Sequence, residues 1–430
     1  MAFIKAYQPE AAAPRRFLFL QGPISPFFAE VAAGLRALGH DAWRINLCLG
    51  DRLFWQGPGA VDYRGRLEDW PGFLAGFLDR HRITDLVLLG EQRPYHKPAI
   101  ALAHARGIAV TVTDFGYLRP DWVVLERDGM GAESRFPRDP AAIRALATQS
   151  PEPDLREHHR DSFATQARWD VLFHLASLLP FPFPHYRSFL LHPPIPAYLS
   201  TALRLLLRKR ETRAAARSLA ELGTLGVPLF LFAMQMETDY SIRAYSRFPD
   251  MDSAIAETVA SFARHAPPEA RLLVKVHPLD PGLKAWARRV RRIAAAAGVA
   301  DRVHYLGGAL PMEVVIEACR GTVTVNSTVG VKSIAMGRST LPLGQAVYNV
   351  PGLAWQGGLD RFWREAEPPE PSLAADFIRA IAACLHVRGC YYTRPGLDVA
   401  VAGTVRRLHL RLLNRPMPEA ATTSPVPASA

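Results

Sequence analysis

Residues 17–21, FLFLQ, decide how this chain folds. The run places four apolar side chains in a row and ends in a glutamine, which is typical of a short strand buried in a parallel sheet. Three similar runs follow at 42–47, 85–90 and 108–112, and amphipathic helical patterns separate them at 27–38, 70–82 and 95–105. This alternation of strand and helix predicts an α/β fold with a doubly wound parallel sheet.

A second series of the same kind begins at Val227. Its predicted strands are 228–233, 271–276, 303–306, 322–326 and 339–343, and its predicted helices are 253–265, 284–297, 311–318 and 330–336. We therefore expect two Rossmann-like domains facing a cleft, at residues 1–222 and 223–415. Two helical patterns after Leu373 are expected to cross back onto the first domain. Residues 416–430 are of low complexity and are predicted to be disordered.

Bulk properties limit the class of protein. The chain has 430 residues, a net charge of +11 and four widely placed cysteines, which indicates anionic partners and a reducing compartment. It has no secretory h-region and no apolar run of the roughly 20 residues that span a bilayer, so we expect a cytoplasmic protein, soluble or peripheral. The glycine, histidine and cysteine motifs of P-loop NTPases, dinucleotide oxidoreductases and zinc hydrolases are missing, and we expect neither a metal nor a cofactor.

A basic helix follows a proline-rich aromatic stretch in the insertion at about 140–222. The helix is predicted over 201–222 and combines a leucine stripe with six cations: Arg204, Arg208, Lys209, Arg210, Arg213 and Arg217. Such a helix suits a membrane surface, where apolar residues enter the interface and cations meet anionic headgroups. A linker helix with a solvated basic face explains the same pattern.

Polar residues follow the predicted strands of the first domain. Ligands of doubly wound sheets bind beyond the carboxyl ends of the strands. The side chains expected there, as acceptor or cleft residues, are Gln21, Glu91, Arg93, Asp114, Tyr117 and Arg119.

Two segments with groups suited to bind an anion follow strands of the second domain. Lys275, His277 and Pro278 form the first, and the lysine and histidine suit a phosphate or carboxylate. The second, Asn326-Ser327-Thr328, opens a helix whose N–H groups favour an anion. A histidine bonded to backbone and a simple helix cap are the structural alternatives. Together the segments predict a nucleotide phosphate site.

Carboxylates complete the predicted chemistry. Glu237 and Asp239 follow the first strand of the second domain, and Asp114 comes from the first domain. Opposed carboxylates suit glycosyl transfer, where one attacks or stabilises the sugar centre and another takes the acceptor proton. The alternative is that Glu237 or Asp239 caps the next helical turn.

The same residues carry a family resemblance. The segments FLFLQGPISPFF, GEQRPYHKPAIALAHARGI, FGYLRPDWVVLE, QMETDYSIRAYS, VKVHPLD and VNSTVG resemble the bacterial capsular polysaccharide synthesis and export proteins, particularly single-module β-Kdo transferases. The resemblance runs from about Phe17 to about Tyr392.

The resemblance implies a retaining GT-B-like glycosyltransferase with CMP-β-Kdo as donor substrate. The first domain would bind the acceptor, a lyso-phosphatidylglycerol or Kdo-bearing glycolipid at the inner face of the cytoplasmic membrane, and the second the donor. Asp239 would be the nucleophile, Asp114 the acid/base, His277 a group near the donor phosphate, and Ser327 and Thr328 donor-binding hydroxyls. The family commonly has two acidic residues before Gly-Tyr-Leu-Arg-Pro, where this chain has Asp114 and Phe115.

Two other functions fit the pattern. One is a transferase that uses another CMP- or UDP-sugar, and the other is a non-catalytic scaffold of capsule export with other capsule assembly proteins as partners. Nucleic acid is not expected as a partner, because no recognised binding module accompanies the positive charge.

Overall fold

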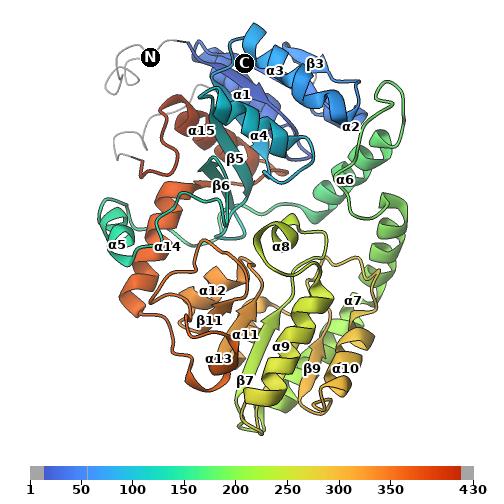
Figure 1. The fold of residues 1–430 in the computed structure, drawn as a ribbon, viewed down its shortest axis with the longest axis vertical. Helices are drawn as coiled ribbons and strands as arrows, with labels where there is room; N and C mark the ends of the chain where they lie inside the picture. The colour runs from blue at the N-terminus through green and yellow to red at the C-terminus, as the bar shows by residue number, and fades with distance from the viewer. Residues whose placement is uncertain (1–13, 56, 418–430) are drawn as a thin grey trace. The chain divides into compact units, whose positions relative to one another are not determined.

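A computed structural model describes residues 14–55 and 57–417 in two compact units (Figure 1). Unit 1 comprises, among these, the residues up to Phe136, then Ala145–Phe189 and the residues from Arg379 onward. Unit 2 comprises Pro137–Arg144 and Leu190–Ile378.

Unit 1 is built on a seven-stranded sheet in the order β12-β6-β5-β4-β1-β2-β3. Strands β1 to β5 pair in parallel, whereas β6 pairs antiparallel with β5 and β12 pairs antiparallel with β6. The strands are β1 Arg16–Phe19, β2 Asp41–Asn46, β3 Ala60–Asp62, β4 Asp85–Leu89, β5 Ala109–Phe115, β6 Trp122–Arg127 and β12 His386–Arg388.

Alternate side chains of β1 pack into two hydrophobic cores, one on each face of this sheet. Phe17 and Phe19 pack with residues of α1 (Phe27–Ala37) and α15 (Gly396–His409). Leu18 and the following Leu20 pack with residues of α3 (Trp70–Arg80) and α4 (His96–Ala105). Since successive strand residues point to opposite faces, this continuous apolar run places the sheet between two helical layers.

The remaining helices of unit 1 are short or peripheral. They are α2 Leu49–Leu53, the 3-10 turn Leu67–Asp69 and α6 Phe163–Ser177. Two helices, α5 (Pro140–Thr148) and α14 (Pro371–Leu385), each contain residues of both units.

Unit 2 has a fully parallel five-stranded sheet in the order β11-β10-β7-β8-β9. Its strands are β7 Leu229–Ala233, β8 Arg271–Lys275, β9 Val303–Leu306, β10 Gly321–Thr324 and β11 Ser339–Pro342. Its helices are α7 Pro194–Gly223, α8 Tyr240–Tyr245, α9 Met251–His265, α10 Trp286–Ala296, α11 Met312–Ala318, α12 Val329–Ala335 and α13 Leu359–Glu365.

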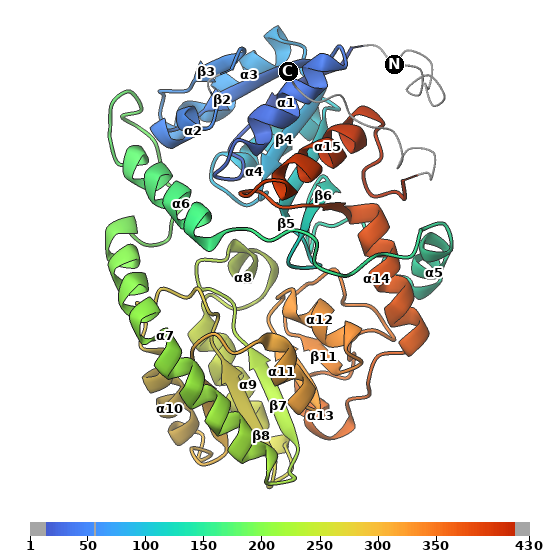
Figure 2. The ribbon, with the colours of Figure 1, turned by 180° about the vertical axis from the view of Figure 1, so that it is seen from behind.

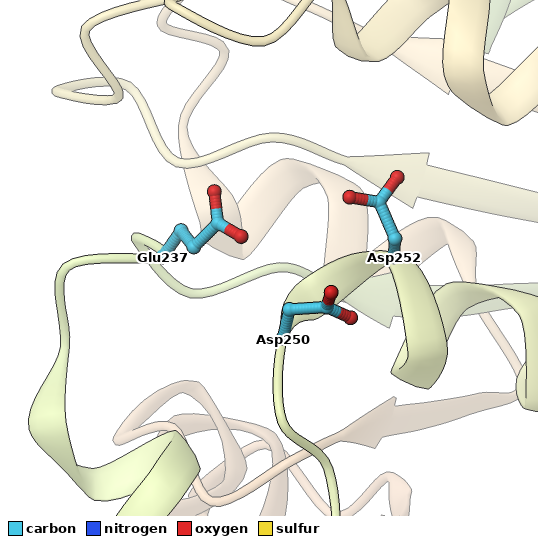
Figure 3. A group of neighbouring side chains, drawn as sticks. All are labelled: Glu237, Asp250 and Asp252. Carbon is cyan, nitrogen blue, oxygen red and sulfur yellow. The ribbon is translucent and has the colours of Figure 1, made fainter.

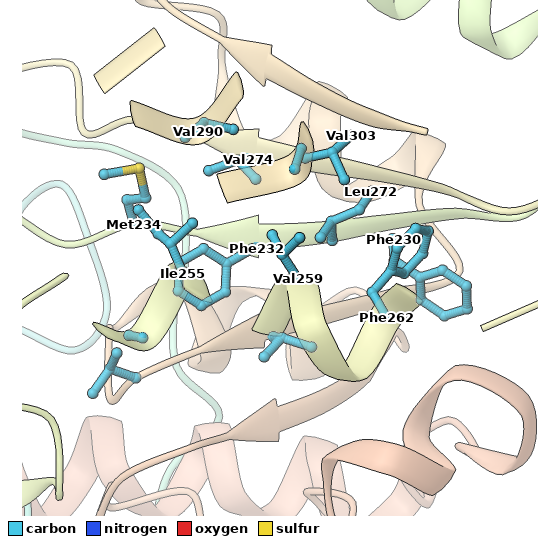
Figure 4. Close-up of a cluster of buried hydrophobic side chains, with 14 of the residues drawn as sticks. Phe230, Phe232, Met234, Ile255, Val259, Phe262, Leu272, Val274, Val290 and Val303 are labelled. Carbon is cyan, nitrogen blue, oxygen red and sulfur yellow. The ribbon is translucent and has the colours of Figure 1, made fainter. Parts of the chain in front are cut away.

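The sheet of unit 2 is also covered on both faces. Phe230 and Phe232 of β7 pack with Ile255, Val259 and Phe262 of α9 (Figure 4). The neighbouring Leu229, Leu231 and Ala233 pack on the other face with residues of α7 and α11. Helix α7 runs along this second face of the unit 2 sheet (Figure 2).

The strand orders indicate where each sheet is expected to bind a ligand. In unit 2 the chain moves from β7 outward to β9, then returns to place β10 on the other side of β7. In unit 1 the same reversal lies between β1 and β4. Doubly wound sheets bind ligands at such topological switch points, at the carboxyl ends of the strands.

The predicted series of strands and helices is confirmed, but the domain boundary at 222/223 is corrected. Helix α7 belongs to unit 2, because Ala215, Leu219 and Leu222 lie in that unit's core. The segment from Arg379 onward belongs to unit 1, as the two late helical patterns predicted, and Gly34 of α1 leaves room for Val405 of α15. Apart from Pro416 and Met417, the predicted tail lies outside the described residues.

Candidate functional site

A hydrogen-bonded network spans the switch point of unit 2. Gln235, two residues after β7, donates from Nε2 to Asn326 Oδ1 at 2.8 Å, and Asn326 follows β10. The backbone N–H of Asn326 donates back to Gln235 Oε1 at 3.0 Å. Ser241 Oγ donates to Asn326 Oδ1 at 3.0 Å, and Asn326 Nδ2 donates to the Ser241 carbonyl at 2.9 Å. The loops after β7 and β10 are therefore fixed to each other through side chains.

Asp239 is oriented by the same network. Its Oδ2 accepts from Gln235 Nε2 at 3.2 Å, and its Oδ1 accepts from the Ser241 N–H at 2.9 Å. The second bond makes Asp239 the N-cap of α8, so the capping alternative describes its geometry correctly. The carboxylate is half-buried. Bonds to both oxygens hold the carboxylate in one orientation, which a nucleophile or a charge-stabilising group requires.

Glu237 lies in an ion-paired cluster instead. Its carboxylate accepts from Lys284 Nζ, which also donates to Asp252 Oδ2 at 2.8 Å. Burial lowers the pKa of Lys284, but its bonds to Asp252 and Glu237 outweigh that effect and raise it above its ordinary value. This lysine meets the charge of Glu237 and gives the carboxylate a structural contact, and the catalytic role of Glu237 stays a prediction.

The carboxylates of Glu237, Asp250 and Asp252 approach one another to within 4.8 Å (Figure 3). Cations of the chain itself neutralise part of this cluster, since Arg289 Nη1 also donates to Asp252 Oδ1 at 2.9 Å. Asp250 accepts from the Ser253 N–H at 2.8 Å and caps α9. These contacts account for the cluster as a tie between the β7–α8 loop, α9 and α10.

Lys275 does not join a phosphate site. Its side chain is 1% exposed, and Nζ donates to the carbonyls of Gly308 at 3.0 Å and Val276 at 3.3 Å. Burial and the nearby Arg204 lower its pKa to about 8. The prediction that Lys275 and His277 act together on an anion is therefore corrected, because this lysine satisfies backbone groups inside unit 2.

His277 follows β8 and the Asn326–Thr328 segment follows β10, the two strands on either side of β7. His277 Nδ1 accepts from the Leu279 N–H at 3.1 Å, so the neutral ring carries its proton on Nε2. Pro278 is exposed. Ser327 Oγ accepts from the Val329 N–H at 3.2 Å, whereas Thr328, the residue before α12, makes no side-chain cap bond. Thr328 and His277 are the residues of this set best suited to an anion.

The strand ends of unit 1 gather most of the predicted acceptor residues. Gln21 follows β1, Glu91 and Arg93 follow β4, and Asp114 lies in β5 next to its end, on three adjacent parallel strands. Burial raises the pKa of Tyr392, which Asp170, Asp161 and Asp114 raise further and Arg93 lowers. The charges of these four residues therefore all act on the hydroxyl group of Tyr392. Whether Asp114 converges with Asp239 of unit 2 stays a prediction.

Two of the predicted acceptor residues have structural partners. Gln21 is 2% exposed and donates to Asp51 Oδ2 and to Tyr186 Oη, both at 3.2 Å. The Tyr117 hydroxyl donates to Glu126 Oε1 at 2.5 Å and accepts from the Gly131 N–H at 2.9 Å. Both side chains hold loops in place through these bonds, and their role toward an acceptor stays a prediction.

The other candidates in unit 1 are Asp114, Glu91, Arg93 and Arg119. Asp114 is half-buried, its Oδ1 accepts from the Phe115 N–H at 2.7 Å, and its carbonyl accepts from Tyr391 Oη at 2.8 Å. Glu91 is 7% exposed. The guanidinium of Arg93 stacks on Phe189 at 4.1 Å, and that of the exposed Arg119 stacks on Phe115 at 5.2 Å. Aromatic support of this kind orients an arginine for a carboxylate or phosphate.

Several positioning residues were not predicted from the sequence. His386 of β12 accepts from the Tyr117 N–H at 2.9 Å and so fixes the turn after β5. Burial lowers the pKa of His386 to about 4, which keeps the ring neutral and able to accept. Tyr391, Gln235 and Ser241 act likewise on Asp114 and Asp239. His386 lies 269 positions from Tyr117 and Tyr391 lies 277 positions from Asp114, so the sequence gives no local signal of these two contacts.

Comparison with known proteins identifies the family. The family described as "Capsule polysaccharide biosynthesis protein" matches residues 84–392. The chain belongs to this family, since the match covers more than half of its length.

Two curated relatives are similar to this chain over most of its length. The chain is 29% identical to the "Capsule polysaccharide export protein KpsS" of Escherichia coli over 389 residues, which cover 88% of this chain and 97% of that protein. It is 28% identical to the "Capsule polysaccharide modification protein LipB" of Neisseria meningitidis, with 88% and 91% covered. Among solved structures, the Thermosulfurimonas dismutans "KpsC, beta Kdo 2,7 transferase" is 12% identical with a TM-score of 0.42, covering 92% of this chain and 100% of the other. A likeness at that TM-score carries no argument about activity.

Proposed function

We propose that this member of the capsule polysaccharide biosynthesis family is a retaining glycosyltransferase. It transfers β-Kdo from CMP-Kdo to a lyso-phosphatidylglycerol-type lipid acceptor and acts as a peripheral protein at the inner face of the cytoplasmic membrane. The observation that carries the proposal is the network at the β7/β10 switch point, in which Gln235 bonds to both Asp239 and Asn326 and so orients the carboxylate. The segments that resemble β-Kdo transferases contain the same residues.

The proposed roles follow from the contacts. Asp239, with both oxygens hydrogen-bonded, attacks the anomeric carbon as CMP leaves, and the covalent sugar then passes to the acceptor with net retention. His277, through Nε2, and Thr328 bind the phosphate of the donor. Asp114 takes the acceptor proton, and Arg93 and Arg119 bind the anionic groups of the acceptor.

An export scaffold is the second candidate, and the name of the Escherichia coli relative favours it. A scaffold gains nothing from an oriented carboxylate at a sheet switch point, so the two functions differ in their need for Asp239. Other capsule assembly proteins are compatible partners in either case.

The direct test is incubation of the purified protein with CMP-Kdo and a lyso-phosphatidylglycerol, followed by mass spectrometry of the lipid. The proposal predicts a lipid that carries one added Kdo, with CMP released in equal amount. CMP-sialic acid and UDP-sugars in parallel reactions test the other donors. If no donor yields a modified lipid under conditions in which the protein is folded, the enzymatic proposal fails and the scaffold is favoured.

A further inference from the structure

The outward face of α7 carries an unusual set of apolar side chains. Its leucine face consists of Ile195, Leu199, Leu203, Leu206 and Leu207, which recur at spacings of three or four residues and therefore share one side of the helix. Leu206 is 81% exposed, Leu199 69% and Leu203 58%. At 1.5 Å per residue this face is about 18 Å long. A contiguous exposed apolar surface of this kind marks an interaction site.

Cations continue the same face toward the end of the helix. The cationic end consists of Lys209, Arg210, Arg213 and Arg217, all exposed. Within the described part of the chain, none of the ion pairs involves these four residues. Arg204, by contrast, lies on the inner side and pairs with Asp280 at 3.4 Å and Glu211 at 3.5 Å. Arg204 is therefore not one of the surface cations, although the sequence pattern placed it among them.

Helix α7 is firmly attached to unit 2, so its outer face is presented on a rigid support. Ser200 Oγ donates to the Pro281 carbonyl at 2.6 Å, and Thr212 Oγ1 accepts from the Ala309 N–H at 2.9 Å. Further along, Ala215, Leu219 and Leu222 are buried in the core against the sheet. These contacts reach from the leucine face to the last turn, which a loosely attached linker helix would lack.

We propose that α7 is a membrane-docking element for an anionic bilayer. The leucine face enters the interface between headgroups and acyl chains, while the cationic end lies at the level of the lipid phosphates. Apolar insertion and electrostatic attraction are both required for strong interfacial binding, and α7 supplies the two in sequence along one face. Among the described residues no helix is long and apolar enough to cross a membrane, so α7 lies on the surface. This inference deepens the proposed function, whose acceptor is a lipid, but vesicle binding is measured without any transfer reaction.

The test is sedimentation of the full chain with vesicles of phosphatidylcholine alone, or of phosphatidylcholine and phosphatidylglycerol in equal amounts. We expect binding to the anionic vesicles only, and its release by high salt. The double variant Leu203→Asp/Leu206→Asp is expected to weaken binding by about tenfold or more, since each leucine no longer leaves water. Arg210→Glu/Arg213→Glu is expected to weaken it by at least about fivefold per cation, as each phosphate-facing charge is lost.

Matched controls separate docking from general changes in charge or hydropathy. Val314→Asp places an acid at an exposed apolar position of α11, and Arg291→Glu/Arg292→Glu makes the same charge change on exposed residues of α10. Both controls should bind like the unaltered protein, and circular dichroism verifies that all variants are folded.

Three results would overturn the docking proposal: no binding to anionic vesicles, equal binding to neutral ones, or equal losses in controls and α7 variants. A dimer in light scattering that Leu203→Asp/Leu206→Asp converts to a monomer, without vesicle binding, would assign the leucine face to a second copy. Transfer to a detergent-dispersed acceptor should survive both α7 variants. Absence of transfer from every form would therefore reject the enzyme and leave the docking result standing.

Discussion

Gln235→Glu is the most discriminating perturbation of the switch-point network, because it changes one atom. Gln235 is 6% exposed, and its Nε2 lies 2.8 Å from Asn326 Oδ1 and 3.2 Å from Asp239 Oδ2. The substitution replaces this donor with an oxygen that faces two acceptors. Two ionised carboxylates at that separation repel by about 5 kcal/mol at an effective dielectric constant near 20.

Protonation of the new glutamate limits the cost. To hold a carboxyl with an ordinary pKa of about 4.3 in its neutral form takes about 4 kcal/mol at pH 7 and about 1 kcal/mol at pH 5. Since the folded state raises the pKa of the new glutamate, the lost stability returns as the pH falls. Gln235→Glu should therefore destabilise unit 2 by about 4 kcal/mol at pH 7 and much less at pH 5, and should slow transfer by loosening Asp239.

Urea unfolding at both pH values, with hydrogen exchange of β7 and β10 peptides as the local readout, measures this effect. The matched control is Gln356→Glu in the same unit, where an exposed Nε2 donates to Asn349 Oδ1 at 3.2 Å and the Ala354 carbonyl at 2.9 Å. A penalty no larger than that of the control, or one that does not shrink in acid, would refute the reasoning.

Three further predictions test separate parts of the structure. His277→Ala and Thr328→Ala should each weaken CMP binding, by roughly 1.5–3 kcal/mol for a bond to a charged group, whereas Lys275→Met should leave it unchanged; calorimetry showing the reverse order would contradict the site. Burial raises the pKa of Glu126 to about 7 from 4.5, so this group's contribution to stability falls as the pH rises through that window. Glu126→Gln should gain thermal stability relative to the unaltered protein between pH 5 and pH 8, and a constant difference in melting temperature would count against it. Glu237→Gln should lower the melting temperature by loosening Lys284 but keep most transfer activity, and loss of transfer without loss of stability would support its catalytic role.

The sequence predicted the core strands well because each is a short apolar run, as in FLFLQ of β1. It missed β3, β6 and β12, since β3 and β12 have only three residues and β6 is held by antiparallel pairing with β5. Ligands of doubly wound sheets bind at the carboxyl ends of the strands, and this strand-end rule depends only on chain direction. It therefore located Asp114, Asp239, His277 and Asn326 correctly at strand ends.

The strand-end rule could not distinguish side chains that face a ligand from side chains that bond to other residues of the protein. Lys275 and Gln21 are each buried beside strand ends, and their acceptors, Gly308 and Asp51, are about 30 residues away in the chain. Glu237 similarly pairs with Lys284, which is 47 residues away in the chain, beyond α9 and β8. Which polar residue of a strand end is available to a ligand is decided by such tertiary contacts, and short-range patterns contain no information about them.

The central claim is that the sugar becomes covalently attached to Asp239, and mass spectrometry of the protein before and after digestion tests it most directly. The protein is slowed at the acid/base position by Asp114→Asn, incubated with CMP-Kdo and digested. The account predicts one added Kdo on the peptide that contains Asp239, and no adduct when Asp239→Asn is introduced as well. An adduct on another peptide, or Asp239→Asn protein that retains most of its transfer activity, would contradict it.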